Sequence, residues 1–103
     1  MIELTSENFS DETANGAVLV DFWSPTCAPC RLMSPVLEEI DGAVPELKVC
    51  KANIMDDVEL AKSLDVNALP TLVYFVNGIE KTRLVGFYPR EHIVEVLDRA
   101  SRM

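Results

Sequence analysis

Apolar and polar positions alternate along the chain with two different periods, and this pattern predicts a sheet flanked by helices. Short and nearly continuous apolar runs predict strands covered on both faces, at Ala17–Trp23, residues 47–52 and Thr71–Val76. Apolar residues spaced three and four apart, beginning with Leu32 and Met33, predict a helix over residues 29–41. That helix is expected to contain a proline and to stop at a glycine.

Shorter signals complete the order of elements. Asn77-Gly78 predicts a hairpin, so Ile79–Val85 is expected to return as an antiparallel strand. An Asp-x-x-Glu start at residues 56–59 predicts a short helix to about residue 64. Apolar periodicity predicts a last helix that begins near Pro89, with Val94 on its apolar stripe. The N-terminal pattern is weaker and indicates a short strand over residues 2–4 and a helix near residues 6–13.

The resulting order, βαβαβαββα, predicts the α/β class, with a central mixed five-stranded sheet flanked by four helices. Strands joined by helices are expected to run parallel, through right-handed crossovers. The length of 103 residues suits a single domain over residues 1–103 with one hydrophobic core.

Charge and terminal patterns exclude several classes of function. Nine basic and 17 acidic residues give a formal net charge of −8, which argues against binding to nucleic acid and to anionic membranes. The chain shows neither a secretory signal pattern nor an apolar run long enough to span a bilayer. We therefore expect a cytoplasmic protein, in a compartment where thiols normally stay reduced.

The most informative feature is the pair Cys27 and Cys30, which opens the helix after a predicted strand. Two Cα atoms at this helical spacing lie within the range for a disulfide, and the helix N-terminus favours the reactive thiolate. The pair is therefore suited to thiol–disulfide exchange. Half of a zinc site and a pair of inert core thiols are the alternatives. Zinc is disfavoured because the remaining candidates, Cys50 and His92, lack the spacing of zinc ligands, and we expect no metal.

Asp21 interrupts the apolar run Ala17–Trp23, so its carboxyl group is expected to be buried with a raised pKa. It shares a strand face with Leu19 and Trp23, toward the helix that carries the cysteines. Asp21 could accept the proton of the second thiol. The alternative is a structural carboxylate that is satisfied by a local hydrogen bond or by Lys51, and the sequence pattern leaves both open.

Together these residues resemble the thioredoxin family. The segments that carry the resemblance share its order and spacing: Val20-Asp21-Phe22-Trp23, Cys27-Ala28-Pro29-Cys30, Pro35, Leu69-Pro70-Thr71, Asn77-Gly78 and Val85-Gly86. The resemblance implies the thioredoxin fold and the activity of a protein-disulfide reductase. It also implies that Cys27 is the nucleophile and Cys30 the resolving thiol, with Asp21 as the buried acid/base and Lys51 as its partner.

The resemblance further implies a substrate-binding surface beside the cysteines. Its expected members are Trp23, Pro29, Ala68, Leu69, Pro70 and Gly86, with a cis peptide bond before Pro70. Ile54 and Phe87 are candidates for this surface or for the core. The implied partners are disulfide-containing client proteins and a separate thioredoxin reductase. The protein itself is expected to be a monomer. No cofactor is expected beyond the Cys27–Cys30 disulfide.

The loop departs from the family pattern at two positions. Thr26 stands where the family usually has tryptophan, and Ala28 stands in place of glycine. Residues around and between the cysteines affect thiolate pKa and redox poise. Two alternative functions therefore stay open within the family. One is an oxidant or isomerase, and the other is a partner-binding redox module with a specialised reductase.

Overall fold

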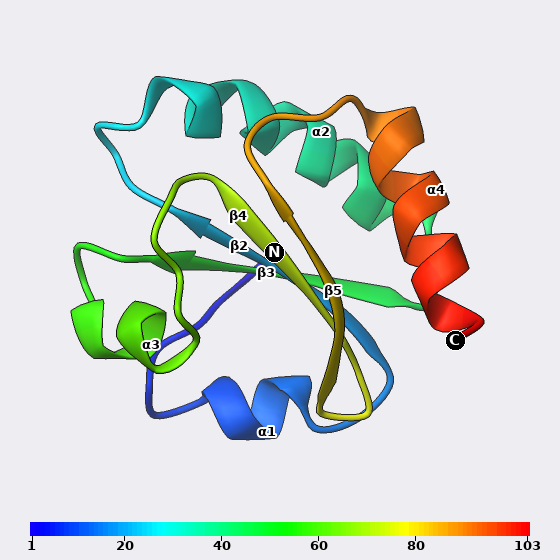
Figure 1. The fold of residues 1–103 in the computed structure, drawn as a ribbon, viewed down its shortest axis with the longest axis horizontal. Coiled ribbons are helices and arrows are strands. Elements are labelled where there is room, and N and C mark those ends of the chain that lie inside the picture. Colours follow the sequence, from blue (N-terminus) through cyan, green and yellow to red (C-terminus); the bar gives the residue numbers. More distant parts are fainter.

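Five strands form one mixed sheet, and four helices flank it (Figure 1). The computed structural model describes residues 1–103. The strands are β1 (Ile2–Glu3), β2 (Ala17–Trp23), β3 (Leu47–Asn53), β4 (Thr71–Val76) and β5 (Ile79–Val85). The helices are α1 (Phe9–Thr13), α2 (Ala28–Ala43), α3 (Val58–Ser63) and α4 (Arg90–Ser101). This arrangement confirms the predicted fold class and the order of elements.

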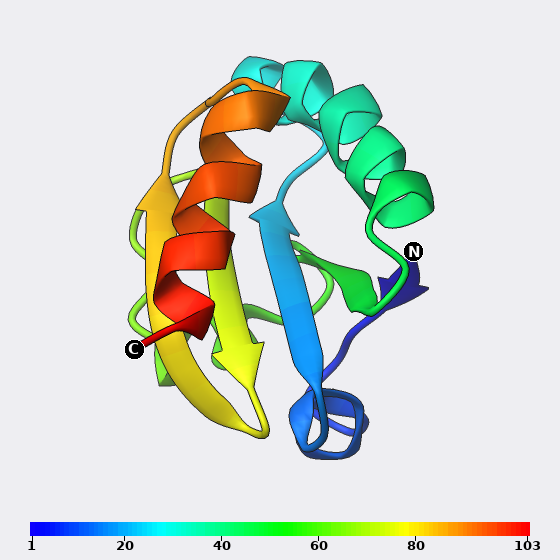
Figure 2. The same ribbon diagram turned by 90° about the vertical axis from the view of Figure 1, so that its right-hand side faces the viewer.

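The strands lie in the order β1-β3-β2-β4-β5, which places β2 at the centre of the sheet (Figure 2). β1, β3 and β2 run parallel, whereas β4 is antiparallel to β2 and β5 is antiparallel to β4. None of the four helices has both the length and the apolar character that a membrane span requires.

The prediction that strands joined by helices run parallel is wrong for β3 and β4. The connecting helix α3 has only six residues and rises about 9 Å, much less than the ~23 Å of a seven-residue strand. The chain therefore leaves β3 and enters β4 at the same end of the sheet. Because the connection does not return along the sheet, β4 runs opposite to β3.

The two faces of the sheet carry separate apolar clusters, and α2 and α4 cover one face while α1 and α3 cover the other (Figure 1). The α2–α4 face buries a cluster of 11 residues that includes Leu19, Met33, Leu37, Ile40 and Leu97. The opposite face buries nine residues, among them Val20, Phe22, Cys50, Leu60 and Val73. Alternate residues of β2 contribute to both clusters, as expected for a strand covered on both faces.

Several predicted helix ends shift in the structure. α2 continues through Gly42 to Ala43, so this glycine is not the stop signal. The N-cap of α3 is Asp57 rather than Asp56, and Asp57 Oδ1 accepts a hydrogen bond from Leu60 N at 3.1 Å. At α1, the predicted first turn is not helical, and the helix begins at Phe9.

Two apolar residues assigned to helix stripes face the solvent instead. Leu32 is 64% exposed on α2 and Val94 is 38% exposed on α4. Each lies one position from a residue with no exposure, Met33 and Ile93 respectively. One residue is a rotation of about 100° on a helix, so the edge of an apolar stripe depends on how the helix is turned against the sheet.

A pair of leucines on α2 tests this account of the core. Leu37→Ala removes a fully buried side chain and should lower the free energy of unfolding by about 3 kcal/mol. Leu32→Ala is the matched control on the same helix and should cost less than about 1 kcal/mol because the side chain is exposed. Urea denaturation followed by circular dichroism measures both, and equal losses would contradict the assigned rotation of α2.

Candidate active site

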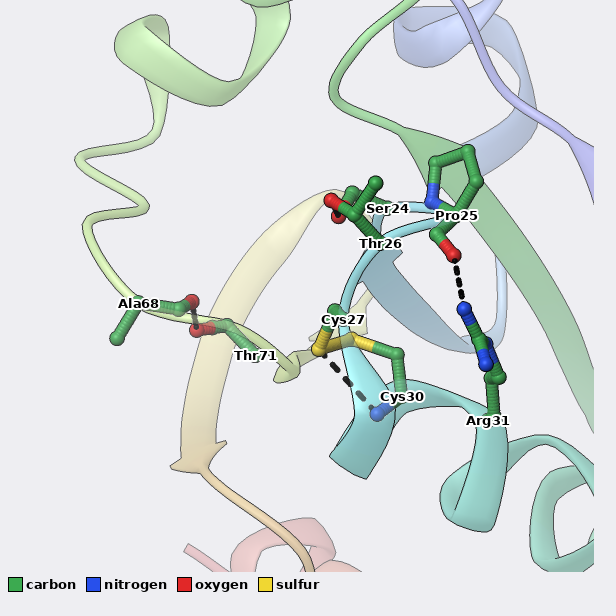
Figure 3. The surroundings of a disulfide bond; sticks show 8 residues. All are labelled: Ser24, Pro25, Thr26, Cys27, Cys30, Arg31, Ala68 and Thr71. Atoms are coloured by element: carbon green, nitrogen blue, oxygen red, sulfur yellow. Dashed lines mark hydrogen bonds between the residues drawn. A yellow bond between two sulfur atoms is a disulfide. The ribbon is translucent and has the colours of Figure 1, made fainter.

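The disulfide between Cys27 and Cys30 lies at the corner where β2 gives way to α2 (Figure 3). Their Cα atoms are 5.3 Å apart, within the range that one helical turn allows. Cys27 is the N-cap of α2 in extended backbone conformation, and its Sγ accepts a hydrogen bond from Cys30 N at 3.3 Å. The first sulfur thus receives an N–H donor at the positive end of a helix, an environment that stabilises a thiolate.

The two cysteines differ in solvent accessibility. Cys27 is partly exposed, whereas Cys30 is 3% exposed and belongs to the buried side of α2. A disulfide of another protein can approach Cys27 directly. Cys30 is shielded from such an approach but lies within bonding distance of the Cys27 sulfur.

Hydrogen bonds hold the loop that precedes the disulfide. Cys27 N donates to Ser24 O at 3.2 Å, and the hydroxyl groups of Ser24 and Thr26 lie 3.3 Å apart. Arg31 Nη2 donates to Pro25 O at 3.0 Å, so the start of the loop is tied to α2 beyond the disulfide (Figure 3). Ser24 and Arg31 belong to this corner but were not singled out from the sequence, since neither residue type signals its role without the loop geometry.

Asp21 is buried on β2, where it is 4% exposed, and burial raises the pKa of its carboxyl group to about 7. Lys51 lies opposite Asp21 on β3. The charge of Lys51 lowers this pKa, but by less than burial raises it. Lys51 Nζ forms an ion pair with Glu3 at 3.6 Å and lies 5.9 Å from the centroid of the Trp23 ring. Asp21 Oδ1 has no hydrogen-bond partner within the protein, so neither Lys51 nor a local hydrogen bond accounts for this oxygen.

A cavity of about 150 Å³ connects the surroundings of Asp21 with those of the disulfide. It is lined by Met1, Asp21, Trp23, Cys30, Arg31, Ser34 and Lys51. The indole Nε1 of Trp23 is the second buried polar atom without a partner. The structure therefore brings the predicted carboxyl group, its predicted lysine neighbour and the buried cysteine to one cavity.

The segment before β4 lies across from the disulfide, where Figure 3 shows Ala68 and Thr71. The peptide bond between Leu69 and Pro70 is cis. Thr71 Oγ1 donates to Ala68 O at 2.6 Å, and Gly86 N donates to Pro70 O at 2.8 Å. Ala68 is exposed and Leu69 is partly exposed, so solvent reaches this segment.

The other predicted contact residues also lie at this end of the sheet. Trp23 and Ile54 are partly exposed and are tied together, because Ile54 N donates to Trp23 O at 3.0 Å. Pro29 is exposed, and Phe87 is 45% exposed directly after Gly86. Leu32 and Met55 are also exposed apolar side chains, at 64% and 65%, and were not predicted as contact residues.

Cys50 lies in β3 with no exposed surface and is a free thiol. Burial raises the pKa of this thiol to about 11. A buried thiol that holds its proton is a poor nucleophile, so Cys50 acts as a small packing residue.

A Cys-x-x-Cys disulfide at a strand–helix corner of an α/β fold defines the chain as a thiol–disulfide oxidoreductase. The family model Thioredoxin matches residues 1–99. Thioredoxin of Bacillus subtilis (strain 168) is 37% identical over 100 residues, which cover 96% of each chain. Thioredoxin of Staphylococcus haemolyticus is 35% identical over 96% of each chain. Thioredoxin of Chlamydia pneumoniae is also 35% identical, over 93% of this chain and 94% of its own.

The chain belongs to the thioredoxin family. Its activity is protein-disulfide reduction by thiol–disulfide exchange through Cys27 and Cys30, on disulfide-containing client proteins. Half of a zinc site or inert thiols would not account for both the disulfide and the family match.

The reactivity of the three thiols provides a test of this assignment. After reduction, iodoacetamide should label two cysteines of the folded protein at pH 8, Cys27 faster than Cys30. Cys50 should be labelled only in denaturant, because its thiol is buried and protonated. Mass spectrometry of peptides counts and locates the labels. Rapid labelling of Cys50 in the folded protein would contradict its assignment as packing.

Proposed function

We propose that Cys27 is the nucleophile and Cys30 the resolving thiol, and that the difference in their exposure carries this assignment. In the reduced protein, the Cys27 thiolate attacks one sulfur of a client disulfide. A mixed disulfide forms and the other client sulfur leaves as a thiolate. Cys30 then attacks the Sγ of Cys27, which releases the second client thiolate. Two electrons pass to the client, and the Cys27–Cys30 disulfide forms.

Asp21 is the base of the second step in this proposal. Cys30 must lose its proton before it attacks, and both groups line the same cavity. A carboxyl group with a pKa of about 7 exchanges protons readily near neutral pH, where its carboxylate accepts the proton from the Cys30 thiol. Lys51 limits the rise of this pKa by its charge, which keeps part of Asp21 ionised at neutral pH.

Client docking is assigned to the surface around Cys27. Ala68, which is exposed, lies across from the disulfide, and an extended client segment would pair with the backbone of Ala68 and the partly exposed Leu69. Apolar side chains at the same end of the sheet would contact the client: Trp23 and Pro29 as predicted, with Ile54 and Phe87. Pro70 is buried and Gly86 has no side chain, so these two predicted contact residues would act by shaping the backbone of the docking surface. Because apolar contact is not directional, such a surface accepts many client sequences.

A separate thioredoxin reductase is the proposed electron donor, since each turnover leaves the protein oxidised and two electrons must be returned. The dithiol needs no bound cofactor for exchange, because the electrons are carried by the sulfur atoms themselves. We assign the activity to a monomer in the cytoplasm, where the thiol pool favours the reduced, client-reducing form.

Replacement of each cysteine separates the two proposed roles. Cys27→Ser should abolish the reduction of insulin, because no nucleophile remains. Cys30→Ser should retain the first step and accumulate a covalent mixed disulfide with the client, because the resolving thiol is missing. Non-reducing gel electrophoresis detects the trapped complex. Trapping by Cys27→Ser rather than by Cys30→Ser would reverse the assignment.

Asp21→Asn tests the proposed base. Resolution of the mixed disulfide, followed by stopped flow, should slow by about tenfold or more, and its pH dependence near pH 7 should disappear. Asp11→Asn is the matched control, since Asp11 is exposed on α1, and it should leave the rate and its pH profile unchanged. An unaltered profile in Asp21→Asn would remove Asp21 from the mechanism.

The same variant should also change stability with a defined dependence on pH. Between about pH 4 and pH 7 the folded protein holds a proton on Asp21 that the unfolded chain has lost, so wild-type stability falls as the pH rises through this window. The asparagine side chain of the variant does not titrate and has no such loss. Asp21→Asn should therefore be more stable by on the order of 4 kcal/mol at pH 8, and equally stable below about pH 4. Urea unfolding at both pH values measures the difference.

A further inference from the structure

An irregularity in β5 brings Glu80 and Arg83 to the same face of the sheet. Phe75 pairs with Glu80 whereas the preceding residue of β4 pairs with Thr82, so Lys81 is an inserted residue. In a regular strand, residues three apart point to opposite faces, but one inserted residue reverses the alternation. The Arg83 guanidinium reaches the carboxylate of Glu80 with Nε–Oε2 at 2.7 Å and Nη2–Oε1 at 2.8 Å.

The same guanidinium also binds the end of α3. Arg83 Nη2 donates to Leu64 O at 3.0 Å, and Nη1 donates to Asp65 O at 3.4 Å. Leu64 is the C-cap of α3, where carbonyl groups lack partners within the helix and a cation is favourable. Glu80 and the two carbonyls therefore fix the planar guanidinium from two sides, and Glu80 neutralises its charge.

These contacts hold a segment whose Leu64 and Val66 pack against the apolar cluster on this face but which has few other hydrogen bonds to the sheet. Between α3 and β4, the backbone hydrogen bonds of residues 64–67 are local, to Ala61 and Lys62 at the end of the helix. The hydrogen bonds from the Arg83 side chain are the ones that join residues 64–67 to the sheet. At its other end, the segment reaches Ala68 and Leu69, the backbone assigned above to client docking.

We propose that Arg83 is a positioning residue for client recognition, which holds the end of α3 on β5 and so keeps the Ala68–Leu69 backbone in place opposite Cys27. The proposal rests on the proposed docking role of that backbone. Arg83 touches neither the client nor the sulfurs, so its effect is on how often the docking backbone is correctly placed. A large client that pairs with this backbone depends on Arg83, whereas a small disulfide that needs only Cys27 does not.

Arg83→Met tests this with two disulfides of different size, insulin and the small aromatic disulfide DTNB. If the docking conformation falls to about a fifth of the molecules, KM for insulin rises about fivefold. The kcat for insulin and the rate constant for DTNB should stay within about twofold of wild type, because the reacting sulfurs are unchanged. Arg83→Lys keeps the charge but loses the planar fork, and should give an intermediate KM.

Two controls separate positioning from general stability. Arg99→Met removes another arginine that is paired with a glutamate, on the exposed side of α4, and should leave the insulin KM unchanged. Glu80→Gln keeps Arg83 but removes the charge that holds it, and should raise the insulin KM by less than Arg83→Met. If Arg83→Met does not fold, Arg83→Lys and Glu80→Gln carry the same comparison. An insulin KM within twofold of wild type, or equal losses with insulin and DTNB, would overturn the proposal.

A separate measurement shows whether the docking assignment itself has failed. In Cys30→Ser trapped with an insulin chain, hydrogen exchange at the Leu69 amide should be slower than in the free protein. Unchanged exchange would overturn the docking role of this backbone and the positioning role with it. Slowed exchange together with an unchanged KM in Arg83→Met would overturn the role of Arg83 alone.

Discussion

Pairing of the central strand β2 on both edges is the constraint on which the rest of the structure depends. β3 and β4 bind it along almost its whole length, and its residues supply both apolar clusters. A shift by one residue would move every side chain of β2 to the wrong face, so its register is fixed. Both halves of the active site follow from it: Cys27 lies just beyond its end, and Thr71, beside Pro70, pairs with Phe22.

The same strand carries a buried ionisable group that works against stability. Asp21 lies in the interior where an apolar residue would be more stable, and burial raises its pKa toward neutrality. Its position next to the cavity shared with Cys30 gives a reason for keeping it. A polar residue that violates the pattern of a core strand is often a functional residue, and here the violation occurs a short stretch of chain before the redox pair.

Much of the fold was predictable because the signals are local. The extents of β2, β4 and β5 followed from apolar runs and one hairpin turn, and the redox pair followed from the spacing of Cys27 and Cys30. The failures concern relations between elements. The direction of β4 depended on where a short connection rejoins the sheet, and the exposure of Leu32 depended on the rotation of α2. The sequence pattern contains neither quantity.

The sequence by itself determined the type of each main element, the cysteine pair and the unusual acid in the central strand, since these depend on residue type and spacing alone. Only the tertiary structure decided which groups meet. It pairs Lys51 with Glu3 rather than with Asp21, and it turns Arg83 toward the end of α3. The physical reason is that hydrogen bonds and ion pairs act over a few ångströms, so partners distant along the chain are chosen by the packed sheet and helices.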